Sequence, residues 1–161
     1  MDKKLFTFDE IKMKLVDYCV YQDRCHSEVE HKMREFVLIP EAKEEILLYL
    51  LKENYLNEER FTRSYIRGKF YIKNWGRNKI KNHLKFNKAI AEKLINSCMN
   101  EIDEKDYLSA ISKLYIAYSQ KLKGLKEYQK EVKTIRHLLS KGFEYELIKE
   151  VLENQENDLN Y

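Results

Sequence analysis

The sequence predicts an all-α protein of three tandem three-helix repeats that form an elongated, curved molecule. Residues that interrupt helices are scarce, since the 161 residues include one Pro and four Gly, whereas the helix formers Glu and Lys are abundant. Apolar residues recur at helical spacing in nine separate segments. These segments fall into three groups of similar length, which predicts repeats at residues 1–54, 55–102 and 103–161.

The first repeat begins with a helix that Thr7 or Asp9 can cap. Ser27 is predicted to start the second helix, because Glu30 follows three residues later as in a capping box. The third helix begins near Pro40, which the first turn of a helix tolerates. The apolar faces of these three helices carry Ile11, Leu15 and Tyr18, then Val29 and Met33, then Ile46, Leu47, Leu50 and Leu51.

The second repeat opens with a longer predicted helix, which Asn57 can cap and Gly76 is expected to end. Its opposite sides differ sharply in character, and Phe70 falls on the basic one. The apolar face, expected in the core, carries Phe61, Tyr65, Gly68, Ile72 and Trp75, and the basic side carries Arg60, Arg63, Arg67 and Asn74. The next helix turns Ile80 and Leu84 inward and carries a second basic stripe of Arg77, Lys81, Lys85 and Lys88. A sixth helix is predicted near residues 89–100.

The third repeat has a helix that opens at Asp106, an interruption at Gly124 and a helix at residues 128–141. Gly142 follows at a C-cap position, where glycine is favoured. The ninth helix is predicted at residues 145–154, and the polar tail after it is expected to fray. From residue 144 onward the chain has six acidic residues and a single Lys.

The middle helices of the three groups carry equivalent apolar pairs, which supports a repeat of pattern rather than of residues. These pairs are Val29/Met33, Ile80/Leu84 and Ile135/Leu139, offset by 51 and 55 residues.

Residues 60–91 form a concentration of positive charge in an otherwise balanced chain. This window contains ten Lys or Arg, six aromatic residues and no acidic residue. Such a stretch attracts an anionic or phosphate-bearing partner. Ordinary solvated helix surface is the alternative interpretation of the same charges.

Several other classes of protein find little support in the sequence. The longest apolar run, residues 46–51, is too short to span a bilayer, and the first ten residues lack the features of a signal peptide; we expect a cytoplasmic protein. The common phosphate-loop, dinucleotide and zinc-protease motifs are absent, so we expect neither an enzyme nor a cofactor. Cys19, Cys25, His26 and His31 have no standard metal-ligand spacing, and we expect buried structural thiols instead of a zinc site.

Four ordered fragments of the chain resemble the RecX family of recombinase regulators. Residues 18–33 contain the first, and residues 55–61, YLNEERF, are similar to the family's Y-L-[ND]-[DE]-E-R-F segment. Residues 73–84 follow its K-x-x-G-x-x-x-I-x-x-x-L run, and residues 138–143 its L-x-x-[KR]-G-F segment. The resemblance departs at residues 85–91, KFNKAIA, where the family often has Lys-Gly-Ile and this chain has one residue more.

The resemblance implies three three-helix repeats and a regulatory role in recombinational DNA repair and the SOS response. Family members bind the RecA filament on single-stranded DNA and suppress ATP hydrolysis and strand exchange. A membrane or a small-molecule substrate is not implied. The expected contacts to the filament or its DNA are Arg60, Arg63, Arg67, Lys69, Phe70, Lys73, Arg77, Lys81, Lys85 and Lys88.

Three alternatives stay open at this level. Arg60 has a competing structural role, in which it pairs with Glu53 or a nearby carboxylate and fixes the join between repeats. The whole protein can instead be a free-standing, sequence-nonspecific binder of single-stranded nucleic acid. It can also be a helical scaffold whose basic patch is only solvated.

Overall fold

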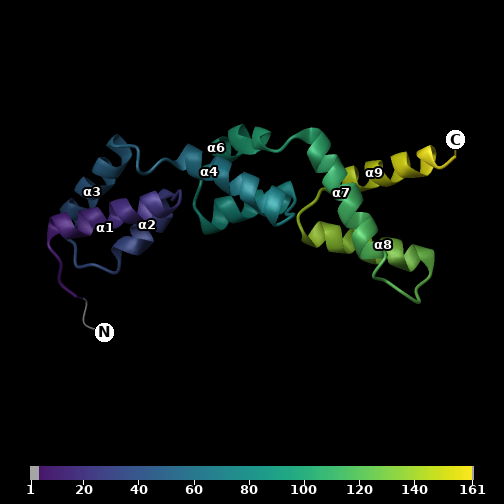
Figure 1. Ribbon diagram of the computed structural model, residues 1–161, viewed down its shortest axis with the longest axis horizontal. Coiled ribbons are helices and arrows are strands. Elements are labelled where there is room, and N and C mark those ends of the chain that lie inside the picture. The colour runs from purple at the N-terminus through teal and green to yellow at the C-terminus, as the bar shows by residue number, and fades with distance from the viewer. Residues whose placement is uncertain (1–3, 161) are drawn as a thin grey trace.

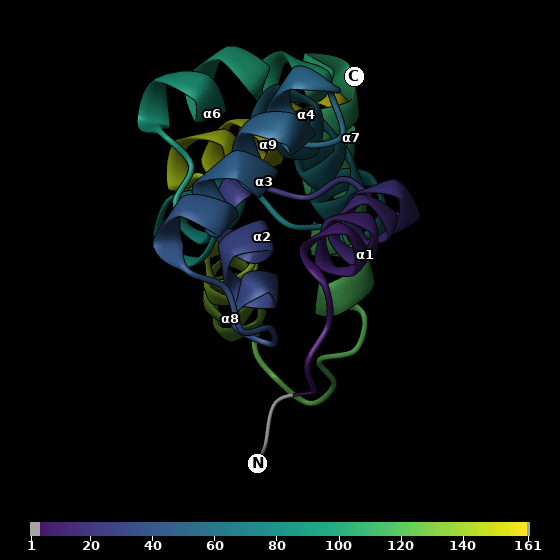
Figure 2. The ribbon, with the colours of Figure 1, turned by 90° about the vertical axis from the view of Figure 1, so that its left-hand side faces the viewer.

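The computed structural model describes residues 4–160, and all regular elements in that part of the chain are helices. They follow one another along an elongated molecule in three groups (Figure 1), which an end-on view superimposes (Figure 2). The expected all-α fold of three-helix repeats is confirmed. The first repeat contains α1 (Phe8–Tyr21), α2 (His26–Met33) and α3 (Pro40–Lys52). The second contains α4 (Glu58–Arg67), η1 (Gly68–Ile72), α5 (Arg77–Asn82), η2 (His83–Asn87), α6 (Glu92–Cys98) and η3 (Met99–Glu101). The third contains α7 (Glu104–Ser119), α8 (Glu127–Ser140) and α9 (Tyr145–Asp158).

Two hydrophobic clusters hold these helices together, and their boundaries do not follow the repeats. The first cluster lies within the first repeat and is closed by Leu56 from the following linker. The second is shared by the second and third repeats, with Phe70, Tyr107 and Phe143 among its members. Cys25 of the first repeat is also buried in the second cluster. The second and third repeats therefore form one packed body.

Most predicted caps are present, but the second helix starts differently from the prediction, and α7 starts at Glu104 with Asp103 as N-cap instead of opening at Asp106. Thr7 forms a capping box with Glu10, and the side chain of Asn57 accepts the backbone N–H of Arg60. The N-cap of α2 is Cys25 instead of Ser27, because the carboxylate of Glu28 accepts the N–H of Cys25 at 3.2 Å. Helix α9 runs to Asp158, so the expectation of a frayed tail after residue 154 is wrong over that length.

The orientation predicted for the long basic helix is wrong in one important respect. Phe70 is 2 % exposed, whereas Ile72, predicted to lie in the core, is 75 % exposed. The buried line consists of Thr62, Ile66 and Phe70, which are four residues apart. The step from Ile66 to Phe70 enters the π-turn η1, where the spacing per turn exceeds the 3.6 residues of an α-helix. The sequence pattern did not predict that the polar residue Thr62 is buried. Its burial is tolerated because its hydroxyl donates a hydrogen bond to the carbonyl of Glu58 at 2.7 Å.

A second π-turn, η2, explains the departure from the family pattern after Leu84. The N–H of Lys88 donates to the carbonyl of His83 five residues earlier, at 3.2 Å. The additional residue is thus absorbed at the end of the helix. The next residue, Ala89, has φ +56°, the left-handed conformation that favours glycine. Gly142, at the equivalent place after α8, has φ +95°.

In α8 the apolar pair of the predicted repeat pattern is wrong at one position. Leu138 is fully buried and Leu139 is 43 % exposed. By contrast, both predicted pairs of the other middle helices, Val29/Met33 and Ile80/Leu84, are buried. The repeat relationship therefore holds in the structure although the third pair lies one residue off.

Equivalent joints connect the repeats. At the first joint, the start of α2 meets the end of η2, where the hydroxyl of Ser27 donates to the carbonyl of Lys88 at 2.8 Å. At the second joint, the start of α5 meets the end of α8, where the N–H of Gly76 donates to the carbonyl of Lys141 at 2.7 Å. The N–H of Asn78 adds a bond to the carbonyl of Gly142 at 3.0 Å. Each joint brings the N-terminal end of one middle helix to the C-terminal end of the next, and a carbonyl at that C-terminal end accepts a hydrogen bond.

Candidate partner-binding surface

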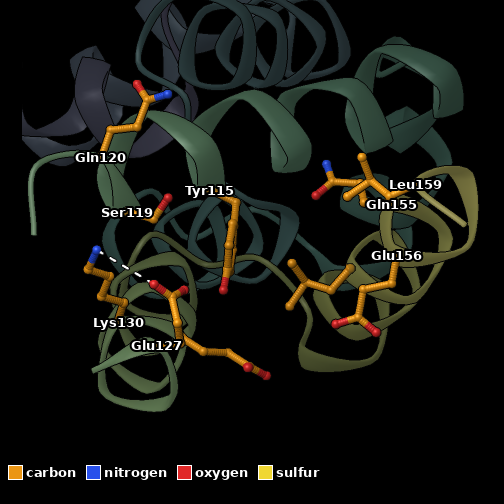
Figure 3. Close-up of a pocket in the computed structure, with 10 residues that line it drawn as sticks. Tyr115, Ser119, Gln120, Glu127, Lys130, Gln155, Glu156 and Leu159 are labelled. Carbon is orange, nitrogen blue, oxygen red and sulfur yellow. Dashed lines mark ion pairs between the residues drawn. The ribbon is translucent and has the colours of Figure 1, made fainter. Parts of the chain in front are cut away.

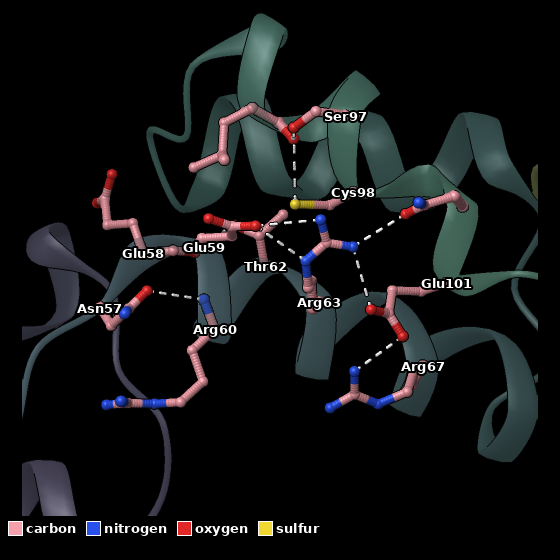
Figure 4. Close-up of polar contacts among 12 residues, drawn as sticks. Asn57, Glu58, Glu59, Arg60, Thr62, Arg63, Arg67, Ser97, Cys98 and Glu101 are labelled. Carbon is pink, nitrogen blue, oxygen red and sulfur yellow. Dashed lines mark hydrogen bonds and ion pairs between the residues drawn. The ribbon is translucent and has the colours of Figure 1, made fainter.

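Arg60 holds the first repeat against the second. Its Nε donates to Asp23 at 2.7 Å, and Nη2 donates to the carbonyls of Asn54 and Tyr55 at 3.0 and 3.1 Å. Figure 4 shows the side chain directed away from the other two arginines of this helix. The structural alternative for Arg60 is therefore confirmed, with Asp23 as the partner instead of Glu53.

Arg63 and Arg67 are bound to the carboxylate of Glu101, which lies on η3 at the end of the same repeat (Figure 4). The distances from the two guanidinium groups to its oxygens are 3.1 and 2.9 Å. Arg63 also contacts Glu59 and Asn100. The guanidinium of Arg67, together with that of Arg63, holds the pKa of Glu101 below its usual range. These two cations are thus partly neutralised within the repeat.

Arg77 is engaged at the second joint. It contacts Glu104 at 2.6 Å and Glu144 at 3.3 Å, and its guanidinium carbon lies 4.0 Å from the ring centre of Tyr107. The hydroxyl of Tyr107 accepts the backbone N–H of Arg77 and donates to Glu144. Burial raises the pKa of the Tyr107 phenol well above its usual range. The phenol therefore stays protonated and remains a donor to Glu144.

Two of the predicted lysines also have carboxylate partners. Lys85 lies 3.3 Å from Glu92 of the same repeat, and Lys88 lies 3.5 Å from Glu28 of the first repeat. The side chain of Lys88 thus adds an ion pair to the first joint, where the carbonyl of the same residue accepts a hydrogen bond from the Ser27 hydroxyl. Phe70, predicted to project outward, packs 5.4 Å from the ring of Tyr107 in the core.

Two lysines of the second repeat without a carboxylate partner, Lys69 and Lys79, lie against Trp75. Among the described residues, Lys69, Lys73, Lys79 and Lys81 form no ion pair. The Nζ atoms of Lys69 and Lys79 lie 4.7 and 4.3 Å from the ring centre of Trp75. The ring of His83 meets Trp75 edge-on at 4.6 Å. We call Lys69, Trp75, Lys79 and His83 the lysine–tryptophan cluster.

This cluster joins residues that the sequence did not assign to a common site. Trp75 was expected in the core, and it does pack against the second cluster, but it remains half-buried. Lys79 and His83 were not among the predicted contact residues. The spacing of Trp75, Lys79 and His83, four residues apart, was the available indication.

A polar pocket in the third repeat stands apart from these cations. It lies between α7, α8 and α9, has a volume of about 480 Å³ and is lined by Tyr115, Lys130 and Glu127, among others (Figure 3). Lys130 and Glu127 form an ion pair across part of it at 3.9 Å. Because all its lining residues belong to the third repeat, it does not contribute to the candidate surface.

The described residues, 4–160, contain no group of three or more potential ligand side chains that could hold a metal ion. Cys19 and Cys25 are buried thiols, as expected, and belong to different hydrophobic clusters. In the same range, no helix has the length and apolar character required to cross a membrane.

Comparison with known proteins decides the family. The family description of the second three-helix domain of RecX matches residues 57–99, and that of the third matches residues 104–152. The chain belongs to the RecX family. The regulatory protein RecX of Streptococcus agalactiae serotype V is 30 % identical over 142 residues, covering 86 % of this chain and 53 % of the relative. That of Streptococcus uberis is 29 % identical over 170 residues, covering 98 % of this chain and 62 % of the relative.

Solved RecX structures share the fold. The crystal structure of RecX from Lactobacillus salivarius superimposes with a TM-score of 0.83 at 24 % identity, over 94 % of this chain and 97 % of that chain. A second RecX crystal structure gives a TM-score of 0.82 at 23 % identity, over 91 % and 73 % of the two chains. The chain spans only 53 % and 62 % of the length of the two streptococcal relatives.

Proposed function

We propose that this RecX-family protein is a cytoplasmic, non-enzymatic regulator that binds the RecA filament on single-stranded DNA and reduces its ATPase and recombinase activity. Relatives similar to most of the chain carry the name regulatory protein RecX, which supports a regulatory role. The filament and its inhibition are the finer part of the proposal. They follow from the family resemblance of the sequence and from the charge of the second repeat.

The observation that carries the proposal is that the basic residues of the second repeat divide into those with carboxylate partners and those without. Arg60, Arg63 and Arg77 serve contacts within the protein. The lysine–tryptophan cluster, with Lys73 and Lys81 beside it in the sequence, keeps positive charge without a carboxylate partner in the described structure. Unneutralised lysines next to an aromatic ring suit a partner that presents phosphate or carboxylate groups.

The direct test is the DNA-dependent ATPase of the cognate RecA at increasing concentrations of this protein. Dose-dependent inhibition is expected, together with co-sedimentation with the filament. A protein that neither inhibits nor binds the filament at micromolar concentration contradicts the proposal.

The contact surface is tested with a charge-matched pair of variants. Lys69→Ala with Lys79→Ala is expected to raise the concentration required for half-inhibition by about ten-fold, because phosphate contacts and their counterion release are lost. The control replaces two exposed lysines of the third repeat, Lys123→Ala with Lys133→Ala, and changes the net charge equally. Equal losses in both variants place the contact outside the cluster.

A free-standing binder of single-stranded nucleic acid is the alternative, favoured by the same unpaired lysines. It predicts that binding to a DNA oligonucleotide without RecA accounts fully for the inhibition. Excess DNA oligonucleotide should then compete for the protein and abolish inhibition of RecA. Inhibition should also fall steeply as the salt concentration rises. Inhibition that persists at saturating DNA favours the filament regulator.

A further inference from the structure

A second surface with aromatic rings and cations lies in the first repeat, which neither of the two matched family descriptions covers. A groove of about 520 Å³ opens between α1 and α2, at the end of the molecule opposite α8 and α9 (Figure 1). Tyr18 and Tyr21 line it together with Lys14, Arg24 and Lys32. The groove is therefore remote from the lysine–tryptophan cluster in sequence and differs from it in composition.

Arg24 is held rigidly inside this groove. Its guanidinium carbon stacks 3.7 Å from the ring centre of Tyr18, and its Nε donates to the carbonyl of Tyr18 at 3.0 Å. A longer contact of 3.9 Å joins it to Glu28, and the side chain is only 12 % exposed. The floor of the groove is thus a fixed layer of ring and guanidinium.

Tyr21 stands above this floor without packing partners of its own. It is 83 % exposed, and the guanidinium of Arg24 lies 6.0 Å from its ring centre. It is the last residue of α1, and the chain continues in extended conformation at Gln22. An exposed aromatic ring at a helix end offers a flat surface to a second ring system.

Lys14 and Tyr21 lie on the same face of α1, seven residues apart. At the rise of an α-helix this separates them by roughly 10 Å. Lys14 is exposed and its Nζ is 4.7 Å from the ring of Phe6, while Lys32 lies across the groove and pairs with Glu35 at 2.7 Å. A ligand that reaches both the ring of Tyr21 and the ammonium of Lys14 must extend over more than a single ring.

The lining also contains acids, and they limit the choice of ligand. Asp17 and Glu35 oppose the three cations, so the groove has a net charge of about one positive unit in this count. This excludes a compact, highly charged anion as the preferred ligand. A chain of aromatic units that carries one negative charge per unit fits better, because stacking supplies part of the attraction.

We propose that this groove binds two or three nucleotides of a single-stranded nucleic acid, with one base stacked on Tyr21 and a neighbouring phosphate near Lys14. A free nucleotide shares this chemistry, but the described structure of the groove includes no enclosed phosphate loop, and its length suits a strand. This site does not rest on the proposed regulation of RecA.

The test measures binding of a short fluorescent oligothymidylate to the full chain by anisotropy, without RecA. Tyr21→Ala is expected to weaken binding roughly five-fold or more, and Tyr21→Phe to retain it, because stacking needs the ring and not the hydroxyl. The control is Val20→Ala, which removes a neighbouring exposed side chain of α1. Equal affinity of Tyr21→Ala and the unmodified protein overturns the proposal.

A second measurement tests the charge of the groove with two variants that are expected to change the affinity in opposite directions. Lys14→Ala is expected to weaken binding and to reduce its salt dependence, whereas Asp17→Asn is expected to strengthen binding. All variants keep the fold, since these side chains are exposed. An unchanged affinity in both variants would show that the oligonucleotide does not bind in the groove. Competition by free thymidine monophosphate as strong as that by the oligonucleotide overturns the choice of a strand.

A comparison of two readouts separates this site from the proposed function. Tyr21→Ala is expected to lower the affinity for the oligonucleotide. Inhibition of the RecA ATPase is measured separately, with the same variant and with the unmodified protein. If the oligonucleotide result fails and ATPase inhibition stands, only the groove is rejected. If ATPase inhibition is absent in the unmodified protein while Tyr21→Ala loses DNA binding, only the regulatory proposal is rejected.

Discussion

The backbone N–H of Gly76 donates to the carbonyl oxygen of Lys141 at 2.7 Å, across 65 residues of sequence. The Cα of Gly76 lies so close to Gly142 that a Cβ there would overlap the carbonyl group of Gly142. This contact is the centre of the second joint, where the start of α5 and the end of α8 meet. It requires glycine on one side for space and on the other for a positive φ.

Gly76→Ala is expected to destabilise the protein by about 2 kcal/mol or more, because neither backbone can move away without breaking the joint. Chemical denaturation followed by circular dichroism measures the change in the free energy of unfolding. Gly68→Ala is the matched control, since a Cβ at Gly68 meets nothing within 4 Å. It should leave stability unchanged or raise it slightly. Similar losses at both glycines would show that the close approach is not decisive.

Ala89→Gly is expected to stabilise the protein by about 1 kcal/mol, because Ala89 holds φ +56° and left-handed backbone costs an L-residue about 1–2 kcal/mol. Ala91→Gly, two residues later at φ −62°, should have no such benefit and serves as the control. Thermal melts of the three proteins decide the matter. A lower melting temperature for Ala89→Gly would contradict the strain attributed to this turn.

The ion pair between Arg60 and Asp23 is expected to couple the first repeat to the second. The pair is partly shielded and its guanidinium also binds two carbonyls, so a coupling energy of about 1 kcal/mol is expected in a double-mutant cycle with Arg60→Met and Asp23→Asn. The exposed pair of Lys130 and Glu127 is the comparison and should give a coupling near zero. Equal values for the two pairs would remove the special role of Arg60.

His137 is expected to make stability depend on pH at mildly acidic values. Burial, followed by the charges of Lys141 and Lys121, lowers the pKa of His137, whose ring stacks on Tyr118 at 3.9 Å. A lowered pKa in the folded state means that the unfolded chain binds a proton more readily. The stabilisation is therefore complete above the ordinary histidine pKa and is lost as the pH falls through the lowered one.

The measurement compares unfolding free energies between about pH 7.5 and pH 5 for the unmodified protein and His137→Phe, which keeps an aromatic stack. The unmodified protein should lose more stability on acidification than the variant. Because the other three histidines are present in both proteins, the difference isolates His137. Parallel curves would show that its ring is fully solvated.

Local sequence patterns predicted the helices well because caps and apolar spacing act within one turn. Thr7, Asn57 and Gly142 occupy the predicted cap positions for that reason. The orientation of Phe70 failed because a π-turn changes the spacing, and no residue near Gly68 announces one. A helical wheel assumes 3.6 residues per turn, and the π-helical segment Gly68–Ile72 has more.

The composition of the sequence identified the basic residues of the second repeat, but it could not identify the carboxylates with which they pair. Arg60 meets Asp23, and Arg67 meets Glu101, at sequence distances of 37 and 34 residues. Only the packing of repeats brings such residues together, so sequence could not separate neutralised arginines from unpaired lysines. That separation changed the candidate surface from the arginines to the neighbourhood of Trp75.

The division of the core also sets an order for folding during synthesis. The first cluster contains no residue later than Leu56, so its helices can pack while the remainder of the chain is still being translated. The second cluster needs Phe143 and Val151, which are translated well after Phe70 and Ile80. Until then Phe70 and Ile80 lack part of their covering, and the second repeat is the part of the nascent chain most in need of a chaperone.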